Sequence, residues 1–320
     1  MVGGEVPTID HREDNMSAPD FSEGCAWIEG EYVPINDARI PITDPGFSRS
    51  DVTYDVAAVW KGKFFRLEDH LDRFERSMAK LHMKLDVDRD QMREILHRCV
   101  QLSGLRDSYV DMIATRGGLP KTGGRDPRTY QNRFYAYAIP YIWIVDPAQT
   151  SGTDLVVARE TIRIPVESVD PTIKNFHWGD LVRATFEAYE RGGKHPILLD
   201  RDGYVTEGPG FNIFAINDGT LYTPDKGVLE GVTRRTVIEL AEREGLSVLV
   251  RAIKEDVLRS AEELFLTSTA GGVMPVKSLD GVAFENGVPG PVTQRLRDLY
   301  WQAHDELPWA VPVEYSVTPA

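Results

Sequence analysis

The sequence predicts an α+β fold of two layers. Short runs rich in β-branched and aromatic residues, which are typical of strands, recur from 26–33 to 263–267. In a few segments between them, apolar residues recur every three or four positions, which indicates amphipathic helices. Many strands interleaved with few helices favour two α+β layers. The chain has 320 residues, enough for one large domain or two medium ones.

Turn signals and changes of periodicity divide the chain into elements. Glu29-Gly30 and Lys61-Gly62 separate strand-like segments and predict two hairpins. From Leu67 onward the apolar period lengthens, which predicts a helix. Expected strands lie at 26–33 (as a hairpin), 53–60, 63–65, 109–115, 133–145, 155–164, 197–199, 204–205, 212–217, 220–222 and 263–267, and expected helices at 67–85, 88–102 (stopping at Gly104), 233–243, 254–260 and 292–305.

Composition also suggests where the domains begin and end. Residues 1–22 are polar and rich in Asp, Glu, Pro and Gly, so we expect a flexible N-terminal arm. Residues 146–152 contain Pro and Gly and are the best candidate for a linker. The prediction is therefore a small domain over 23–145 and a larger domain over 153–320.

Charge and composition exclude several classes of function. Lys and Arg number 36 and Asp and Glu 50, a net charge of −14, which repels nucleic acid and anionic lipid. The sequence has no apolar run long enough for a membrane span and no secretory signal. The two cysteines, Cys25 and Cys99, make no disulfide framework, and no His/Cys cluster suggests a metal. We therefore expect a cytoplasmic protein without a metal ion.

Lys174 is the first candidate for chemistry. It lies in the segment 169–180 among apolar and aromatic residues such as Ile173, Phe176 and Trp178. A lysine withdrawn from water favours its neutral amine, which is the form that Schiff-base chemistry needs. Lysines in loops are most often simply solvated, so this pattern alone is a weak signal.

Glu207 is the second candidate. It enters the Gly208-Pro209-Gly210 turn between two strands, where glycines allow a ligand to approach the backbone closely. A carboxylate beside a pyridine nitrogen would hold the ring protonated, and a protonated ring is a better electron sink. The simpler interpretation is a glutamate in a surface turn.

Three further features suit a phosphate group. Residues 231–233 open a helix whose free backbone amides would bind an anion, unless Thr233 is a plain N-cap. The small hydroxyl and glycine residues at 268–272 would donate to a phosphate or form a turn. The forked guanidinium of Arg73 matches a phosphate, although acidic neighbours on the same helix offer surface ion pairs instead.

The order of these motifs is more informative than any one of them. A lysine, Thr206-Glu207-Gly208 about thirty residues later, Gly-Val-Thr-Arg at 231–234 and Thr-Ala-Gly-Gly at 269–272 resemble the fold-type IV pyridoxal 5'-phosphate (PLP) enzymes. This family includes branched-chain aminotransferases, D-amino acid aminotransferases, aminodeoxychorismate lyases and (R)-selective amine transaminases. The chain resembles the amine transaminases most, in segments 50–56, 64–70, 170–175, 178–180 and 221–225.

This resemblance implies a small N-terminal α/β domain, a larger C-terminal barrel-like α/β domain and a PLP cofactor. Lys174 would hold the cofactor as an aldimine, and Glu207 would pair with its ring nitrogen. The implied reaction moves an amino group from an (R)-configured primary amine to a keto acid such as pyruvate, through a 1,3-proton shift by Lys174 and a pyridoxamine 5'-phosphate form. A homodimer would bury the active sites at its interface. The implied phosphate ligands are Arg73, Gly231, Val232, Thr233, Ser268 and Thr269.

The resemblance also implies a substrate pocket, and two departures from the family pattern concern it. Amine transaminases often have a histidine where this chain has Arg49. They also often carry a carboxylate-binding arginine in a loop that corresponds to 116–125, where Lys121 or Thr122 stands instead. Because a carboxylate in an apolar pocket needs a cation, we expect Arg49, Lys121 or Arg125 to receive it. The implied pocket residues are Phe47, Tyr54, Val56, Ile144, Trp178 and Ala270, with Tyr109 and Asp111 from the second subunit.

The sequence leaves alternatives open. Arg49 favours a D-amino acid aminotransferase, unless it forms a structural ion pair with Asp51 or Asp44. The Asp-x-Thr-Tyr-Asp segment at 51–55 and Trp178 favour amines. A branched-chain aminotransferase fits the matching segments less well. A PLP-dependent lyase would eliminate rather than transfer, and an inactive homologue would lack the lysine or the glutamate that this chain has.

Overall fold

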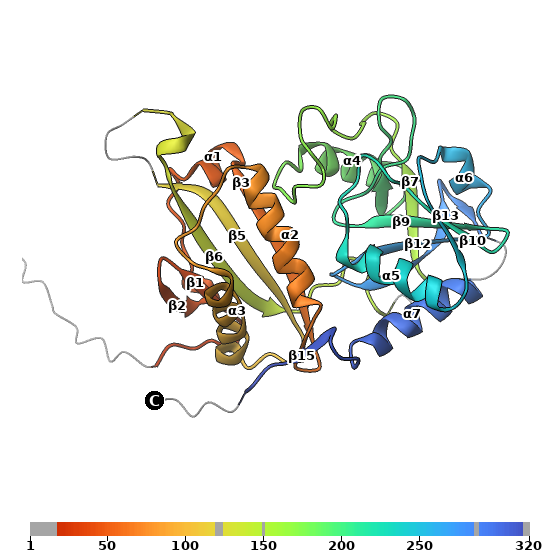
Figure 1. Ribbon diagram of the computed structural model, residues 1–320. Coiled ribbons are helices and arrows are strands. Elements are labelled where there is room, and N and C mark those ends of the chain that lie inside the picture. Colours follow the sequence, from red (N-terminus) through yellow and green to blue (C-terminus); the bar gives the residue numbers. More distant parts are fainter. Residues whose placement is uncertain (1–17, 119–123, 149–150, 285–287, 316–320) are drawn as a thin grey trace, which may run out of the picture.

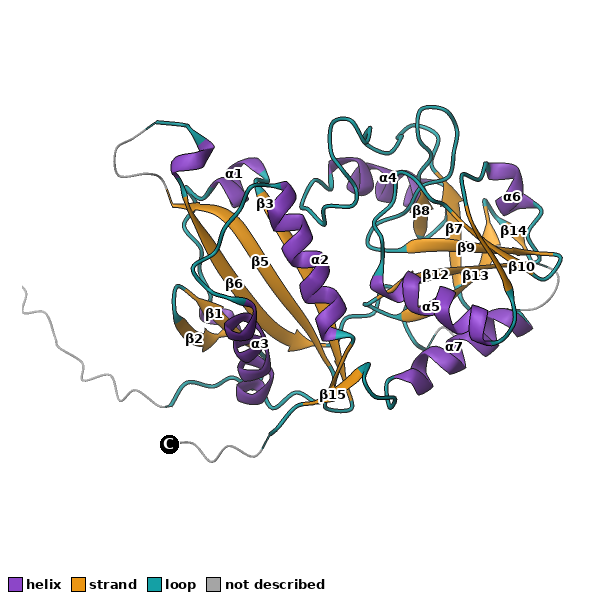
Figure 2. Cartoon of the chain, viewed as in Figure 1, coloured by secondary structure: helices purple, strands orange, loops and turns teal. Residues whose placement is uncertain are grey.

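The computed structural model describes residues 18–118, 124–148, 151–284 and 288–315. These residues form two halves, each built on a β-sheet. Figure 1 shows the halves side by side. The earlier part of the chain forms one half and the later part the other, except that the C-terminal strand β15 joins the first half. Figure 2 shows helices packed against both sheets. The predicted α+β fold is therefore confirmed.

Seven antiparallel strands form the first sheet. They are β1 (Cys25–Ile28), β2 (Glu31–Pro34), β3 (Val52–Trp60), β4 (Lys63–Phe65), β5 (Ser108–Gly118), β6 (Gln131–Pro140) and β15 (Ala310–Pro312), in the order β15-β4-β3-β5-β6-β1-β2. The helices of this half are α1 (Pro45–Arg49), α2 (Leu67–Lys80) and α3 (Arg89–Ser103). Helices α2 and α3 pack on one face of the sheet and enclose its apolar core. The other face is left for the second half of the chain.

Helix α2 confirms the predicted apolar stripe but is shorter than expected. Leu67, Leu71 and Phe74 are buried against the sheet. The expected helix to residue 85 is wrong, because α2 ends at Lys80. Two residues later His82 has a φ of 52°, a left-handed conformation that a helix cannot continue through. This early end directs the chain toward α3.

Helix α3 follows its predicted signals. The side chain of Asp88 accepts a hydrogen bond from the Gln91 amide, and the Gln91 side chain accepts one from the amide of Asp88, which forms a capping box. Gly104 ends the helix with a φ of 69°, a conformation that favours glycine. The expected stop at Gly104 is confirmed.

The second sheet mixes parallel and antiparallel strands. Its strands are β7 (Thr153–Val157), β8 (His195–Ile197), β9 (Asn212–Asn217), β10 (Thr220–Thr223), β11 (Ser247–Val250), β12 (Glu263–Ser268), β13 (Gly272–Leu279) and β14 (Val282–Ala283). The order is β11-β10-β9-β12-β13-β7-β8, and β14 pairs with β13. The helices are α4 (Gly179–Glu190), α5 (Val232–Arg243), α6 (Glu255–Arg259) and α7 (Pro291–Ala303).

Two predicted strands end early. The strand expected over 133–145 stops at Pro140. Beyond it, the Tyr141 hydroxyl and the Ile144 amide donate hydrogen bonds to the loop after β12 and not to a neighbouring strand. The strand expected over 155–164 stops at Val157, and the amides of residues 159 and 160 donate to the carboxylate of Glu187 on α4 instead of to a neighbouring strand. The expected strand at 204–205 forms only isolated bridges.

Six α-helices and β-strands of the described residues have no counterpart in the sequence prediction: α1, α4, β11, β13, β14 and β15. Helix α4 lacks a clean apolar stripe, because Leu181 and Ala184 are buried while Val182 and Phe186 are exposed. Strand β13 contains Pro275, which weakens the strand signal. None of the helices in the described parts of the chain is both long and apolar enough to cross a bilayer.

Candidate active site

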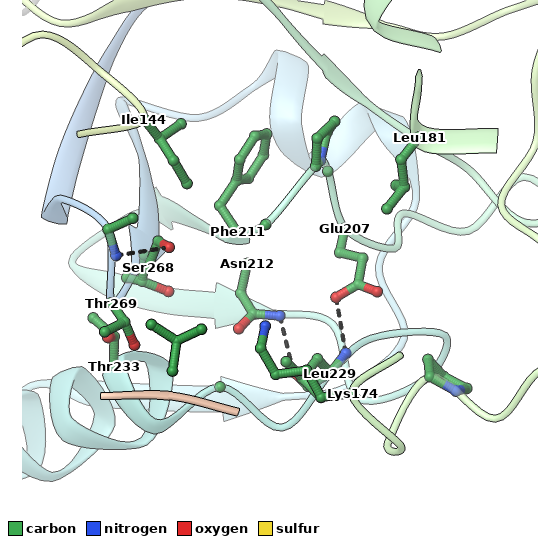
Figure 3. A pocket seen from close by; sticks show the side chains of 18 of the residues that line it. Ile144, Lys174, Leu181, Glu207, Phe211, Asn212, Leu229, Thr233, Ser268 and Thr269 are labelled. Atoms are coloured by element: carbon green, nitrogen blue, oxygen red, sulfur yellow. Dashed lines mark hydrogen bonds between the residues drawn. The ribbon is translucent and has the colours of Figure 1, made fainter. Parts of the chain in front are cut away.

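A cavity of about 300 Å³ lies where the two halves meet, and its walls come from both. Figure 3 shows it from close by. The first half contributes residues of β3 and β5 from the face of its sheet opposite to α2 and α3, together with Arg73 from α2. The second half contributes loops and the ends of its strands and helices. Its lining residues include Tyr54, Val56, Arg73, Tyr109, Ile142, Ile144, Arg163, Lys174, Trp178, Leu181, Glu207, Phe211, Leu229, Gly231, Val232, Thr233, Thr267, Ser268, Thr269 and Ala270.

Lys174 is held against β3 by its own backbone. Its carbonyl oxygen accepts hydrogen bonds from the Tyr54 amide at 3.1 Å and from Thr53 Oγ1 at 2.7 Å. Its side chain is half-buried, and Nζ lies 4.4 Å from the centre of the Tyr54 ring. In Figure 3 the amine points into the space between Glu207 on one side and the Ser268–Thr269 segment on the other. Lys174 is therefore positioned to meet a ligand in the cavity.

Glu207 is buried and held at both oxygens. Its Oε1 accepts a hydrogen bond from Arg163 Nη2 at 3.1 Å, and its Oε2 accepts one from the Leu229 amide at 2.8 Å. Burial raises the pKa of Glu207, while the Arg163 charge and the Leu229 amide act in the opposite direction. The surface-turn interpretation is thus excluded, and the carboxyl group faces the cavity.

Arg163 was not identified from the sequence, although it organises this side of the cavity. Its Nη1 donates to Asp180 at 2.6 Å at the start of α4, while Nη2 bonds to Glu207. The sequence carries no local signal that singles it out, because Arg159 and Glu160 lie in the same run 155–164 and are exposed.

Arg73 is fixed by a buried carboxylate. Asp55 on β3 accepts hydrogen bonds from Arg73 Nε at 2.7 Å and Nη2 at 2.8 Å, and His70 Nδ1 lies 2.8 Å from the same carboxylate. Arg73 Nη1 donates to the Glu230 carbonyl at 3.0 Å. Burial alone would raise the pKa of Asp55, but the Arg73 charge and the hydrogen bonds from Arg73 and His70 hold it well below its usual range. A guanidinium has five N–H groups, so Arg73 keeps donors for a further anion.

The start of α5 and the end of β12 supply neutral donors on the same side of the cavity. Gly231 caps α5 without a side-chain hydrogen bond, which leaves the first amides of the helix free. Thr267 Oγ1 is buried without a hydrogen-bond partner among the described residues. Together with the remaining donors of Arg73, this arrangement fits a phosphate group. The simple N-cap role considered for Thr233 is excluded, because the cap residue is Gly231.

The structure brings most predicted residues to the cavity, but not all. Asp111 lies on the same face of β5 as Tyr109 but is buried beside Tyr137, and it does not line the cavity. Phe47 and Arg49 lie on α1 with exposed side chains, and Arg125 is also exposed. None of these three lines the cavity. Lys121 lies outside the described residues.

The ion pair considered for Arg49 is not formed. Asp51 binds Arg116 at 2.9 Å through both of its oxygens. Asp44 instead accepts hydrogen bonds from the Gly46 amide and the Thr115 hydroxyl. Within the described part of the chain, Arg49 therefore has no ion pair with either carboxylate.

Comparison with known proteins defines the class. Residues 53–279 match the model of the amino-transferase class IV family. The chain belongs to the class IV aminotransferases, and its fold is that of the fold-type IV PLP enzymes.

Individual relatives carry two kinds of name. The chain is 30% identical, over 86% of its length and 94% of the other, to a Methanocaldococcus jannaschii protein provisionally named as a branched-chain-amino-acid aminotransferase. It is 28% identical, over 84% of its length and 93% of the other, to a D-alanine aminotransferase of Bacillus licheniformis. The crystal structure of the branched-chain aminotransferase of Thermoproteus uzoniensis with norvaline has a TM-score of 0.82 and 27% identity, and covers 91% of this chain and 99% of that one.

The cofactor follows from the family. Class IV aminotransferases use PLP, and a further branched-chain amino acid aminotransferase, with a TM-score of 0.84 and 27% identity, is crystallised with pyridoxamine 5'-phosphate. The side chains in the cavity fit this molecule, because they combine an amine, a buried carboxyl group and a set of phosphate donors. The expected cofactor is therefore confirmed, and the enzyme is an aminotransferase.

Proposed function

We propose that this enzyme is an (R)-selective amine transaminase, which moves an amino group from an (R)-configured primary amine to a keto acid such as pyruvate. The proposal assigns Lys174 as the catalytic residue and Glu207 as the partner of the cofactor ring nitrogen. Arg73, Gly231, Val232, Thr233, Ser268 and Thr269 would hold the phosphate. The choice of an amine as donor rests on one observation: the arginines that line the cavity are already paired with carboxylates.

Both arginines that line the described part of the cavity already have carboxylate partners. Arg73 binds Asp55, and Arg163 binds Asp180 and Glu207. An amino acid donor would bring a carboxylate into apolar surroundings, where it needs an uncommitted cation. A primary amine without a carboxylate has no such need. The apolar walls suit an amine such as 1-phenylethylamine, whereas an amino acid donor would depend on the same second-subunit cation as the keto acid.

The keto acid still brings a carboxylate. We assign it to Arg49, Arg125 or Lys121. Arg49 and Arg125 lie outside the cavity of their own subunit, and Lys121 is not among the described residues. In a homodimer the second subunit would present these residues, together with the exposed Phe47, to the neighbouring cavity, whereas Asp111 is buried within its own subunit. Exposed apolar side chains on one face of α4 support such an association, since Phe186 is 63% exposed and Tyr189 57%.

Bound PLP supplies an aldehyde that captures amines and a ring that withdraws electrons. Lys174 would hold the cofactor through its amine. Once released by the donor, the same amine would be placed to take a proton from the donor carbon and return it, which is the acid–base role assigned to this residue. Because the same Lys174 amine would remove and return the proton, both transfers would occur on one face of the cofactor. This is the source of the selectivity for one enantiomer.

Glu207 and Arg163 keep the ring electron-poor. An ionised Glu207 holds the ring nitrogen protonated, and Arg163 stabilises that ionised form against burial. Leu229 fixes the carboxylate from the other side through its amide. Trp178 and Ile144 line the cavity with apolar surface and would help to exclude water from it.

The test is a donor panel with the purified holoenzyme. Pyruvate is the acceptor for the amines and for L-leucine, and 2-oxoglutarate is the acceptor for D-alanine, because D-alanine and pyruvate would only regenerate each other. We expect (R)-1-phenylethylamine to react well, the (S)-enantiomer not to react, and D-alanine and L-leucine to react poorly. Ketone and alanine should form in equal amounts, whereas a lyase would release ketone without alanine. Lys174→Ala should lose both the yellow absorbance of the holoenzyme and turnover. A clear preference for D-alanine would contradict the proposal.

A D-amino acid aminotransferase is the second candidate. The D-alanine aminotransferase of Bacillus licheniformis supports it, as does Arg49, a cation that a donor carboxylate could use. A branched-chain aminotransferase is the third, supported by the likeness to the Thermoproteus uzoniensis enzyme. The same panel separates all three, because each predicts a different best donor.

A further inference from the structure

Tyr141 joins the two halves of the enzyme at the cavity. It follows β6 directly, in the segment that leads into the second sheet. Its hydroxyl donates a hydrogen bond to the carbonyl oxygen of Thr269 at 2.5 Å and accepts one from the Gly271 amide at 2.9 Å. Further along the same segment, the Ile144 amide donates to the carbonyl oxygen of Ala270 at 3.0 Å. The connecting segment thus holds the loop 269–271 between β12 and β13.

Glycines let this loop turn tightly into β13. Gly271 has a φ of 138° and Gly272 a φ of 66°, which only glycine adopts without strain. Within the loop, the Ala270 amide donates to Ser268 Oγ at 3.2 Å. The Tyr141 hydroxyl bridges a carbonyl oxygen and an amide on either side of Ala270, so one side chain closes the turn.

Tyr141 acts on the cavity without touching it. Ile142 and Ile144 line the cavity on one side of the segment, and Thr269 and Ala270 line it from the loop, whereas Tyr141 does not. The Tyr141 ring is packed against aromatic neighbours, with its centre 5.5 Å from that of Trp60 and 5.0 Å from that of Trp143. Burial also raises the pKa of the Tyr141 hydroxyl, so it remains a donor throughout the neutral range.

We propose that Tyr141 is a positioning residue that sets the loop 269–271 for the reaction. The inference rests on the proposed function, in which Ser268 and Thr269 hold the cofactor phosphate and Ala270 and Ile144 form the substrate wall. The Tyr141 hydroxyl would then position both the phosphate-binding residues and the wall of the substrate pocket. It would also couple the position of both to the segment that joins the two sheets.

The test compares Tyr141→Phe with a matched control, Tyr315→Phe. Tyr315 also donates its hydroxyl to a backbone carbonyl, that of Leu105 at 2.7 Å, but away from the cavity. In Tyr141→Phe two buried backbone groups of the loop lose their partner. We expect PLP to bind this variant about tenfold more weakly and the KM for the amine donor to rise severalfold. Tyr315→Phe should have the PLP affinity and the KM of the wild type.

Hydrogen exchange of the holoenzymes provides a second readout. We expect the peptide that covers 268–272 to exchange faster in Tyr141→Phe, with no change there in Tyr315→Phe. The contrary result would be that both variants lose thermal stability, while their PLP dissociation constants and the exchange of this peptide stay within about twofold of the wild type. Tyr141 would then have only a structural role, and the inference would be wrong. Absence of PLP binding in the wild type would instead overturn the proposed function.

Discussion

Arg163 Nη2 lies 3.1 Å from Glu207 Oε1, and this contact sets the electrostatics of the cavity. Without Arg163, a buried carboxyl group at this place would take up a proton. With it, the group can face a protonated ring as an anion. The role proposed for Glu207 therefore depends on Arg163, which itself takes no part in the proton transfer.

Replacing Arg163 with methionine tests this dependence. Burial already raises the pKa of Glu207, and removal of the opposing charge will raise it further. We expect kcat to fall by about 100-fold at neutral pH and the acidic limb of the pH–rate profile to move to higher pH. The matched control is Arg159→Met, which removes an exposed pair with Glu255. An unshifted profile in Arg163→Met would show that Glu207 does not need this partner.

Asp55→Asn tests the anchoring of Arg73. Asp55 is fully buried, and its replacement leaves the Arg73 charge without its carboxylate partner. Breaking a buried ion pair costs about 3–5 kcal/mol, which urea unfolding will measure. PLP affinity should fall as well, because Arg73 loses its fixed orientation. Asp305→Asn, in an exposed pair with Lys63, is the control and should change neither quantity.

Asp111 predicts a pH dependence of stability. Burial raises its pKa to about 8, although Tyr137 and Lys174 oppose this shift. The folded state therefore binds this proton more tightly than the unfolded chain does. The resulting stability is fully present below the unfolded pKa of about 4 and is lost as pH rises through the folded pKa of about 8.

Asp111→Asn should remove this dependence. Between about pH 5 and pH 8 the free energy of unfolding of the wild type should fall relative to the variant, by at most about 1.4 kcal/mol per pH unit. Urea unfolding of both proteins across this range measures the difference. A constant difference at all pH values would mean that Asp111 is ionised throughout.

The basic residues outside the cavity are tested with pyruvate. If Arg49 of the second subunit receives the keto-acid carboxylate, Arg49→Ala should raise the KM for pyruvate about tenfold and leave the KM for the amine unchanged. Arg125→Ala is the parallel experiment for the other exposed arginine. Unchanged pyruvate kinetics would remove the substituted residue from the set of candidates.

Part of the site and of the fold is predictable from the sequence. Lys174 and Glu207 both line the cavity, and the sequence pointed to them through the order of their motifs and the family resemblance, since each local pattern alone is a weak signal. The caps of α3 are predictable from local chemistry, since Asp88 and Gly104 act on their own neighbours. Features that depend on residues adjacent in sequence can be derived without the fold.

Features that depend on distant segments could not be derived. Arg163 and Glu207 are 44 positions apart, and their contact exists because the chain after β7 returns beside the strand segment near Leu198. The early end of β6 has the same origin, because Tyr141 bonds to residues 128 and 130 positions away. No local pattern carries such information.

The last strand, β15, pairs with β4 of the first sheet after the chain has completed the second. The Arg66 amide also donates to the Trp309 carbonyl at 2.6 Å. The polypeptide thus passes between the halves twice, at Tyr141 and again after α7. A fragment cut after residue 145 would have an unpaired edge at β4, so the N-terminal half is not expected to be stable when expressed by itself.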